Sequence, residues 1–187
     1  MVKQVPVKIK RLHPDAVIPR YARELDAGFD LVAIEDAIIR PGETVMVRTG
    51  LAMALPPGYE LQIRPRSGIS KDTKLRISNA PGTVDAGYKN EICVLIDNIA
   101  HPIPSQVKNS EIMFEATFKL IGIDGKPTDY VPEGMKDESF YKQTYIIRKG
   151  ERIAQGVLSE VPRAIFKELN ELDGYDRGGG FGSTGTR

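Results

Sequence analysis

The sequence predicts an all-β fold of the sandwich, barrel or jelly-roll type. The chain has 187 residues, of which 18 are glycine and 13 are proline, so only short segments remain between turn-forming residues. Several of these segments alternate apolar and polar residues with the period of two that a half-buried strand requires. Many short strands separated by such turns are typical of all-β architectures rather than of α/β folds.

The strands are expected in order at residues 5–9, 45–48, 51–55, 59–64, 92–96, 145–148 and 153–158. The run Ile92-Cys-Val-Leu-Ile96 is apolar on both faces, which predicts a central strand covered on both sides. Only two stretches look helical. Ser67 to Thr73 has room for one turn, and Arg163 to Leu172 allows either a short helix or a strand.

Composition restricts the kind of partner and the compartment. Lys plus Arg number 26 and Asp plus Glu number 25, so no overall field favours nucleic acid or an anionic membrane. Cys93 is the single cysteine, which excludes an intrachain disulfide, and with two histidines a Cys/His zinc site is implausible. No apolar run approaches membrane-spanning length and no signal peptide opens the chain, so we expect a cytoplasmic protein.

We expect a single domain over residues 1–187 that contains two atypical regions. Residues from about 101 to 144 have an apolar strand pattern of their own but no evident chemistry. Residues from about 174 to 187 are rich in glycine and poor in apolar side chains, which predicts a flexible arm.

The segment Arg64-Pro-Arg-Ser-Gly68 can bind an anion. Arg66 offers a bidentate fork for phosphate oxygens, and Ser67 supplies a hydroxyl and a free N–H group. If a helix begins here, its first amides add to the site. The alternative is a solvated arginine at an ordinary strand end.

The segment Asn79 to Ile92 looks like a hairpin, with Asp85 at its approach and Tyr88 on its far limb. A carboxylate held there can orient a water molecule as general base, and the tyrosine ring can press on a sugar. The alternative is a turn aspartate beside a half-buried tyrosine.

Three further pieces carry weaker signals. In the tail, Arg177 and Phe181 stand among glycines that let the backbone wrap around phosphates, although a disordered terminus has the same composition. Asp30 begins a strand and can hold a water molecule of a hydrated Mg²⁺; otherwise it is an acid at a strand edge. Gln155 is either a ligand or a structural group that shares a face with Ile153.

The order of these pieces resembles a known family. Ala-Gly-x-Asp-Leu, Pro-Arg-Ser-Gly, Gly-x-Val-Asp-x-x-Tyr, Arg-Ile-Ala-Gln and Arg-Gly-x-x-Phe-Gly-Ser-Thr-Gly occur in sequence. They look like the five ordered motifs of the trimeric dUTP diphosphatases. The resemblance covers roughly residues 5–100 and 145–187, so residues 101–144 are interpreted as an insertion between the third and fourth motifs.

The resemblance implies a jelly-roll-like β-barrel that assembles as a homotrimer with shared active sites. It implies hydrolysis of dUTP to dUMP and pyrophosphate with Mg²⁺ as cofactor. That reaction limits uracil incorporation into DNA and supplies dUMP for dTMP synthesis. The first, second and fourth motifs would come from one subunit, the third from another, and the tail from the third.

The resemblance also implies roles for individual residues. Asp85 would activate the water that attacks the α-phosphorus, and Asp30 would act on the metal through water. Tyr88 would pack on deoxyribose and leave no room for a 2′-hydroxyl. The implied substrate-binding residues are Arg66, Ser67, Gly68, Asn79, Thr83, Val84, Tyr88, Cys93, Gln155, Arg177, Phe181, Gly182, Ser183 and Thr184.

Two features depart from the family pattern. Asn90 stands where the family usually has glycine, and because asparagine tolerates a left-handed backbone we expect the hairpin to survive. The insertion is the second departure, and a regulatory protein that docks a partner through it is an alternative function. A dCTP deaminase of the same fold would need a catalytic glutamate near Leu95, and the strand offers no acid before Asp97.

Overall fold

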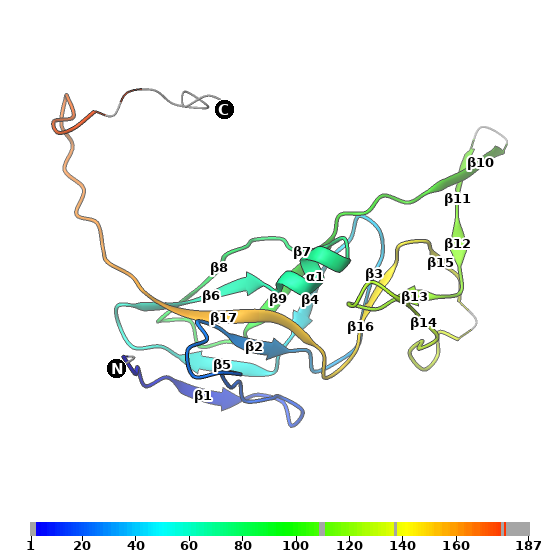
Figure 1. Ribbon diagram of the computed structural model, residues 1–187, viewed down its shortest axis with the longest axis horizontal. Coiled ribbons are helices and arrows are strands. Elements are labelled where there is room, and N and C mark those ends of the chain that lie inside the picture. Colours follow the sequence, from blue (N-terminus) through cyan, green and yellow to red (C-terminus); the bar gives the residue numbers. More distant parts are fainter. Residues whose placement is uncertain (1–2, 109–110, 137, 177, 179–187) are drawn as a thin grey trace.

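Nearly all regular structure in this computed structural model is β, as the sequence predicts (Figure 1). The structure describes residues 3–108, 111–136, 138–176 and 178. The single helix of this part is α1 (Ser67–Asp72). The strands are β1 (Lys8–Arg11), β2 (Phe29–Val32), β3 (Ala37–Ile39), β4 (Thr44–Arg48), β5 (Leu51–Ala54), β6 (Tyr59–Pro65), β7 (Leu75–Ile77), β8 (Gly82–Asp85), β9 (Cys93–Asn98), β10 (Pro104–Lys108), β11 (Glu111–Phe114), β12 (Ala116–Thr117), β13 (Leu120–Ile121), β14 (Pro127–Thr128), β15 (Phe140–Tyr141), β16 (Tyr145–Ile147) and β17 (Arg152–Glu160).

Three sheets form the body of the molecule. Their strand orders are β2-β17-β6-β8, β4-β9-β7 and β1-β5. The long strand β17 lies between β2 and β6, so that Gln155 is paired with Asp30 on one side and with Arg64 on the other. This register brings together segments that are 125 and 91 positions apart in the sequence.

The core lies between these sheets and follows the predicted alternation. In β6 the side chains of Leu61 and Ile63 are buried, while the intervening Gln62 is not. The jelly-roll-like all-β fold is therefore stabilised by removing one face of each sheet from water.

Two local predictions are wrong. Strand β9 is central in its sheet, as predicted, but its burial alternates, so that within one chain one face is buried and the other only half-buried. Residues 163–172 form neither helix nor strand, and the side chains of Ile165 and Phe166 are 96% and 94% exposed. Neither helix nor strand forms there because the described part of this chain offers those apolar side chains no surface to pack on.

Residues 101–144 divide into a projecting half and an anchored half. The hairpin β10–β11 extends away from the body (Figure 1). By contrast, β13 joins the sheet β14-β13-β16-β3. There Leu120 and Phe140 bury their side chains against Ile146 in a small second core. The segment is therefore partly built into the fold.

The described residues contain no helix long and apolar enough to cross a membrane.

Candidate active site

A pocket of about 240 Å³ lies between β8 and β9. Six of the predicted site residues line it, and Ile63 and Ile92 contribute apolar surface. Its lining residues are Ile63, Asn79, Gly82, Thr83, Val84, Asp85, Tyr88, Glu91, Ile92, Cys93, Val94 and Leu95. The structure therefore brings Asn79, Thr83, Val84, Tyr88 and Cys93 to one place beside Asp85.

The pocket exists because the two strands do not pair with each other. Strand β8 pairs with β6 and is the edge strand of its sheet. Strand β7 pairs with β9 only over Ile96–Asn98, and the Ser78 N–H donates to the Leu95 carbonyl just beyond. The predicted hairpin is therefore wrong in detail, since its limbs belong to separate sheets. Within the described residues, backbone N–H and C=O groups on the facing edges of β8 and of the start of β9 therefore point toward the pocket.

Gly82 makes room at the floor of this pocket. A Cβ atom at this position would lie 3.2 Å from Nδ2 of Asn79 and 3.4 Å from Cβ of Ile63. A side chain here would therefore push the Asn79 amide away from the pocket.

Asp85 and Tyr88 are held by the turn that follows β8. The Tyr88 N–H donates to the Asp85 carbonyl at 3.0 Å, which closes the turn and leaves the Asp85 carboxylate exposed at the pocket rim. The Tyr88 hydroxyl donates to the Glu91 carbonyl at 2.9 Å. Asn90 does not use the left-handed conformation that asparagine tolerates. Among the described residues, Gln143 is the one non-glycine residue with a positive φ. The side-chain bond from Tyr88 to Glu91 closes this loop instead.

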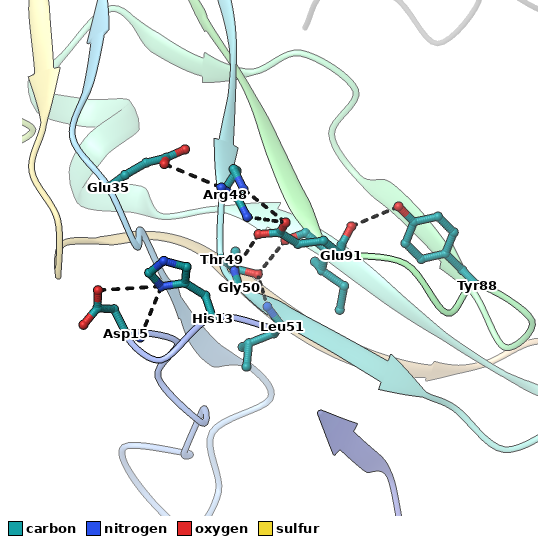
Figure 2. A network of polar contacts seen from close by, with 10 residues as sticks. His13, Asp15, Glu35, Arg48, Thr49, Gly50, Leu51, Tyr88 and Glu91 are labelled. Atoms are coloured by element: carbon teal, nitrogen blue, oxygen red, sulfur yellow. Dashed lines mark hydrogen bonds and ion pairs between the residues drawn. The ribbon is translucent and has the colours of Figure 1, made fainter. Parts of the chain in front are cut away.

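Glu91 is a site residue that the sequence analysis missed. Its carboxylate accepts hydrogen bonds from the Arg48 Nε at 3.1 Å and from the Gly50 N–H at 2.8 Å (Figure 2). The pairing raises the pKa of the Arg48 guanidinium through the hydrogen bond and the charge of Glu91. Its partners are more than forty residues away, so no local pattern signals it.

Cys93 lines the same pocket as a half-buried thiol. Burial raises the pKa of this thiol, and the nearby Glu91 carboxylate adds to the effect. The side chain is therefore protonated at neutral pH and contributes contact surface rather than a nucleophile.

A second cluster gathers charged residues at the far end of β6. The Asp30 carboxylate lies 3.0 Å from the Arg66 Nε and 3.3 Å from an Arg152 Nη1. The Arg66 Nη1 also donates to the Arg152 carbonyl at 3.1 Å. Arg152 is a second residue that the sequence analysis missed, and the available signal was its place as the first residue of the Arg-Ile-Ala-Gln motif.

The predicted anion segment leads directly into helix α1. Arg66 is the N-cap residue with extended backbone, and no side chain caps the first turn. A Cβ atom at Gly68 would meet nothing within 4 Å, so the chain is open to solvent on that side of Gly68. Arg66, Ser67 and Gly68 therefore present donors to solvent beside Asp30, and Gln155 lies next to them on β17.

The donor set for a metal is small. Among the described residues no three His, Cys, Asp or Glu side chains converge on one point. Oδ1 of Asp30 is buried and accepts no hydrogen bond of good geometry, although the Arg66 guanidinium lies beside it. This arrangement suits a contact through water to a cation that the substrate phosphates hold, rather than a protein cage.

The two clusters are far apart within one chain. Asp85 is paired with Glu60 at the start of β6, whereas Arg66 follows the end of that strand. Six residues of extended chain separate Glu60 from Arg66, which corresponds to roughly 20 Å. The predicted tail residues Arg177, Phe181, Gly182, Ser183 and Thr184 lie outside the described residues.

Comparison with known proteins assigns the site to a class. The sequence model of the dUTPase family matches residues 15–106. The chain is 41% identical over 182 residues to the deoxyuridine 5′-triphosphate nucleotidohydrolase of Thermobifida fusca strain YX, covering 97% of this chain and 79% of that protein. It is 36% identical over 180 residues to the corresponding enzyme of Helicobacter pylori strain J99, covering 96% of each chain.

Solved structures give the same result. The Staphylococcus bacteriophage 80alpha dUTPase with dUPNHPP superposes with a TM-score of 0.82 at 28% identity, covering 96% of this chain and 98% of that chain. The dUTPase from phage phi11 of S. aureus, described with its species-specific insert, has a TM-score of 0.77 at 25% identity, covering 91% and 99%. The fold and site thus define a nucleotidohydrolase. The chain belongs to the dUTPase family, and its enzymatic activity is that of a dUTP diphosphatase.

Proposed function

We propose that this chain hydrolyses dUTP to dUMP and pyrophosphate by in-line attack of an Asp85-activated water on the α-phosphorus. The reaction would limit uracil incorporation into DNA and supply dUMP for dTMP synthesis in the cytoplasm of a cell or, for a phage protein, of its host. The observation that carries this proposal is the Asp85 carboxylate at the rim of a pocket walled by two strand edges.

Uracil recognition follows from those edges. Uracil presents two carbonyl acceptors around one N–H donor, and free backbone N–H and C=O groups of β8 and β9 can match that pattern as a paired base would. Ile63 and Ile92 bring apolar surface against the ring. We propose that uracil packs between these walls with its C5 edge against them, so that thymine is rejected because its C5-methyl group would clash.

Sugar selection is assigned to Tyr88. The phenol donates to a backbone carbonyl three residues further on, which fixes the direction of the ring beside the pocket. A fixed ring packed on deoxyribose leaves no space for a 2′-hydroxyl. Rejection of a ribonucleotide then comes from a steric clash rather than from a missing contact.

The phosphates are assigned to the second cluster. Arg66, Ser67 and Gly68 would bind phosphate oxygens through the guanidinium and the amides that precede α1, and Gln155 would add its amide. The charge developing on the departing pyrophosphate is neutralised by these donors. A phosphate-bound Mg²⁺ would supply further neutralisation, and the buried Oδ1 of Asp30 would accept from one of its water ligands.

The separation of the clusters supports a homotrimer with shared sites. A general base must lie within hydrogen-bond reach of the attacking water. Asp85 and Arg66 of one chain are roughly 20 Å apart along β6, too far to serve the same α-phosphate. Asp85 of one subunit would therefore act on a nucleotide held by Arg66 of a second, and Arg177 and Phe181 of the third would close over it.

A second role through residues 101–144 is favoured by one observation. In the projecting part, Ile112, Met113 and Phe118 are 57%, 45% and 71% exposed, and these side chains do not contribute to the pocket. Several large apolar side chains exposed on one segment are typical of protein contacts. We propose a protein partner for this surface in addition to catalysis, not in place of it.

The proposed function is tested by pyrophosphate release from dUTP, dTTP, dCTP and UTP in the presence of Mg²⁺. Turnover of dUTP alone is expected. Ammonia release from dCTP, or equal turnover of dTTP, would overturn the assignment.

A further inference from the structure

Glu91 joins the wall of the pocket to the turn between β4 and β5. Its Oε1 accepts from the Gly50 N–H at 2.8 Å, and its Oε2 lies 3.1 Å from two nitrogens of Arg48 (Figure 2). The Glu91 side chain is only 18% exposed, so these bonds are partly shielded from water. Shielded, charge-assisted bonds constrain geometry more than solvent-exposed pairs do.

The turn that Glu91 contacts is itself rigid. Gly50 has a φ of +66°, and a Cβ atom there would lie 2.9 Å from the Cβ atoms of His13 and Ala16. Its carbonyl accepts from the Leu12 N–H at 2.7 Å. The amide to which Glu91 binds therefore has a fixed position.

The neighbouring backbone is secured to the same turn. The Thr49 hydroxyl donates to the Ile92 carbonyl at 2.5 Å, and the Ile92 N–H donates to the Leu51 carbonyl at 2.7 Å. On the other side of Glu91, its carbonyl accepts from the Tyr88 hydroxyl at 2.9 Å. A displacement of Glu91 thus moves the acceptor that fixes the Tyr88 ring.

We propose that Glu91 is a positioning residue for sugar discrimination, acting through Tyr88. Its carboxylate locks residue 91 onto the Arg48–Gly50 turn, and its carbonyl then holds the Tyr88 ring at the distance that excludes a 2′-hydroxyl. The inference rests on the proposed function, in which Tyr88 packs on deoxyribose. It explains how the loop keeps its shape with Asn90 in place of glycine.

The readout is the ratio of kcat/KM for dUTP to kcat/KM for UTP, measured for each variant as the full chain. This ratio does not depend on the concentration of active enzyme, so partial unfolding alone cannot change it. Glu91→Ala should lower the ratio about tenfold, mainly by letting UTP bind. Tyr88→Phe should lower it in the same direction, because it removes the hydroxyl that meets the Glu91 carbonyl.

Two further variants test whether the charge of Glu91 is needed and whether the effect is specific to this position. Glu91→Gln keeps an oxygen for the Gly50 N–H and should recover most of the ratio. Glu43→Ala is the matched control, because Glu43 also accepts from a backbone amide (Arg40 N–H, 2.9 Å) and pairs with an arginine, at the opposite end of β4. This control should leave the ratio unchanged.

A Glu91→Ala ratio within twofold of wild type would overturn the inference, as would an equal loss in Glu43→Ala. If Glu91→Ala is insoluble, Tyr88→Phe decides: an unchanged ratio overturns the inference and a lowered ratio supports it. A wild-type chain that fails to hydrolyse dUTP, or that accepts UTP equally, would instead overturn the proposed function.

Discussion

The Nε atom of Arg66 lies 3.0 Å from Oδ1 of Asp30, although 36 positions separate the two residues. The contact spans the central strand β17, which pairs with β2 and β6 and sets Gln155 between Asp30 and Arg64. Because Arg152 approaches the same carboxylate, one acid compensates two guanidinium groups. The register of the sheet thus holds both arginines in place where we propose that the phosphates bind.

Neutralising Asp30 should weaken both folding and metal use. Asp30→Asn leaves the partly buried Arg66 guanidinium and the more exposed Arg152 without their counter-charge, and the free energy of unfolding should fall by about 1–3 kcal/mol. The Mg²⁺ concentration for half-maximal activity should rise. Urea unfolding and a Mg²⁺ titration measure the two effects.

The matched control is Asp129→Asn. Asp129 also pairs with a cation, Lys119 at 2.9 Å, but its side chain is 89% exposed. No measurable change in stability is expected there. Equal stability of Asp30→Asn and wild type would contradict the role given to Asp30.

Cys93 offers a direct probe of pocket occupancy, because it is the only cysteine of the chain. Burial raises its pKa, so less thiolate is present at neutral pH, and alkylation by iodoacetamide should be slower than for a free cysteine and should accelerate as pH rises. A non-hydrolysable dUTP analogue should slow the reaction further, as followed by mass spectrometry. The corresponding dCTP analogue should not protect, and equal labelling with and without the dUTP analogue would place uracil elsewhere.

The projecting hairpin should be removable without loss of activity. The Glu115 N–H donates to the Ile103 carbonyl at 2.7 Å, so residues 104–114 can be replaced by a two-residue glycine turn. Steady-state dUTP hydrolysis by this variant should equal wild type. Lost activity in a folded trimer would show that the hairpin belongs to the site.

A larger deletion serves as the contrast. Removing residues 102–143 also removes Leu120 and Phe140, which cover Ile146 in the second core. That variant should lose several kcal/mol of stability, since each large buried side chain contributes about 2–5 kcal/mol. Thermal unfolding distinguishes the two deletions.

The fold class and the main strands could be predicted from the sequence because alternation is a local property. Residues 59–63 illustrate this, since Leu61 and Ile63 point into the core as their spacing requires. The pairing partners could not be predicted in the same way. Strands β8 and β9 are neighbours in sequence, yet β8 pairs with β6 and β9 with β4, because long-range packing outweighs local proximity.

The candidate site also could be predicted only where the signal is local. Asp85, Tyr88 and Arg66 lie in recognisable short motifs, so their residue types and order indicated chemistry. Glu91 was overlooked because its function depends on Gly50, and that contact exists only after β4, β5 and β9 are assembled. The apolar residues of 163–172 indicated regular structure, but regular structure also needs a surface to pack on.

Asp85→Asn should abolish turnover while leaving the nucleotide bound. The amide cannot accept the water proton, and loss of a general base costs about 10²–10⁴-fold in kcat. Asp85 lies at the exposed end of β8, so the fold and the affinity for a dUTP analogue should be retained. Calorimetry measures the affinity for the dUTP analogue, and pyrophosphate release measures turnover. Unchanged turnover would show that Asp85 is not the general base.

The central claim, that Asp85 of one subunit acts at the Arg66 site of another, is tested most directly by subunit complementation. Asp85→Asn and Arg66→Gln chains, each inactive alone, are unfolded together in equal amounts and refolded as mixed trimers. About one quarter of the shared sites in a random cyclic trimer then receives an intact Asp85 from one chain and an intact Arg66 from its neighbour. We predict recovery of dUTP hydrolysis to about that fraction of the wild-type rate. If the mixture stays as inactive as its components although mixed trimers form, each site is built by one chain and the account is wrong.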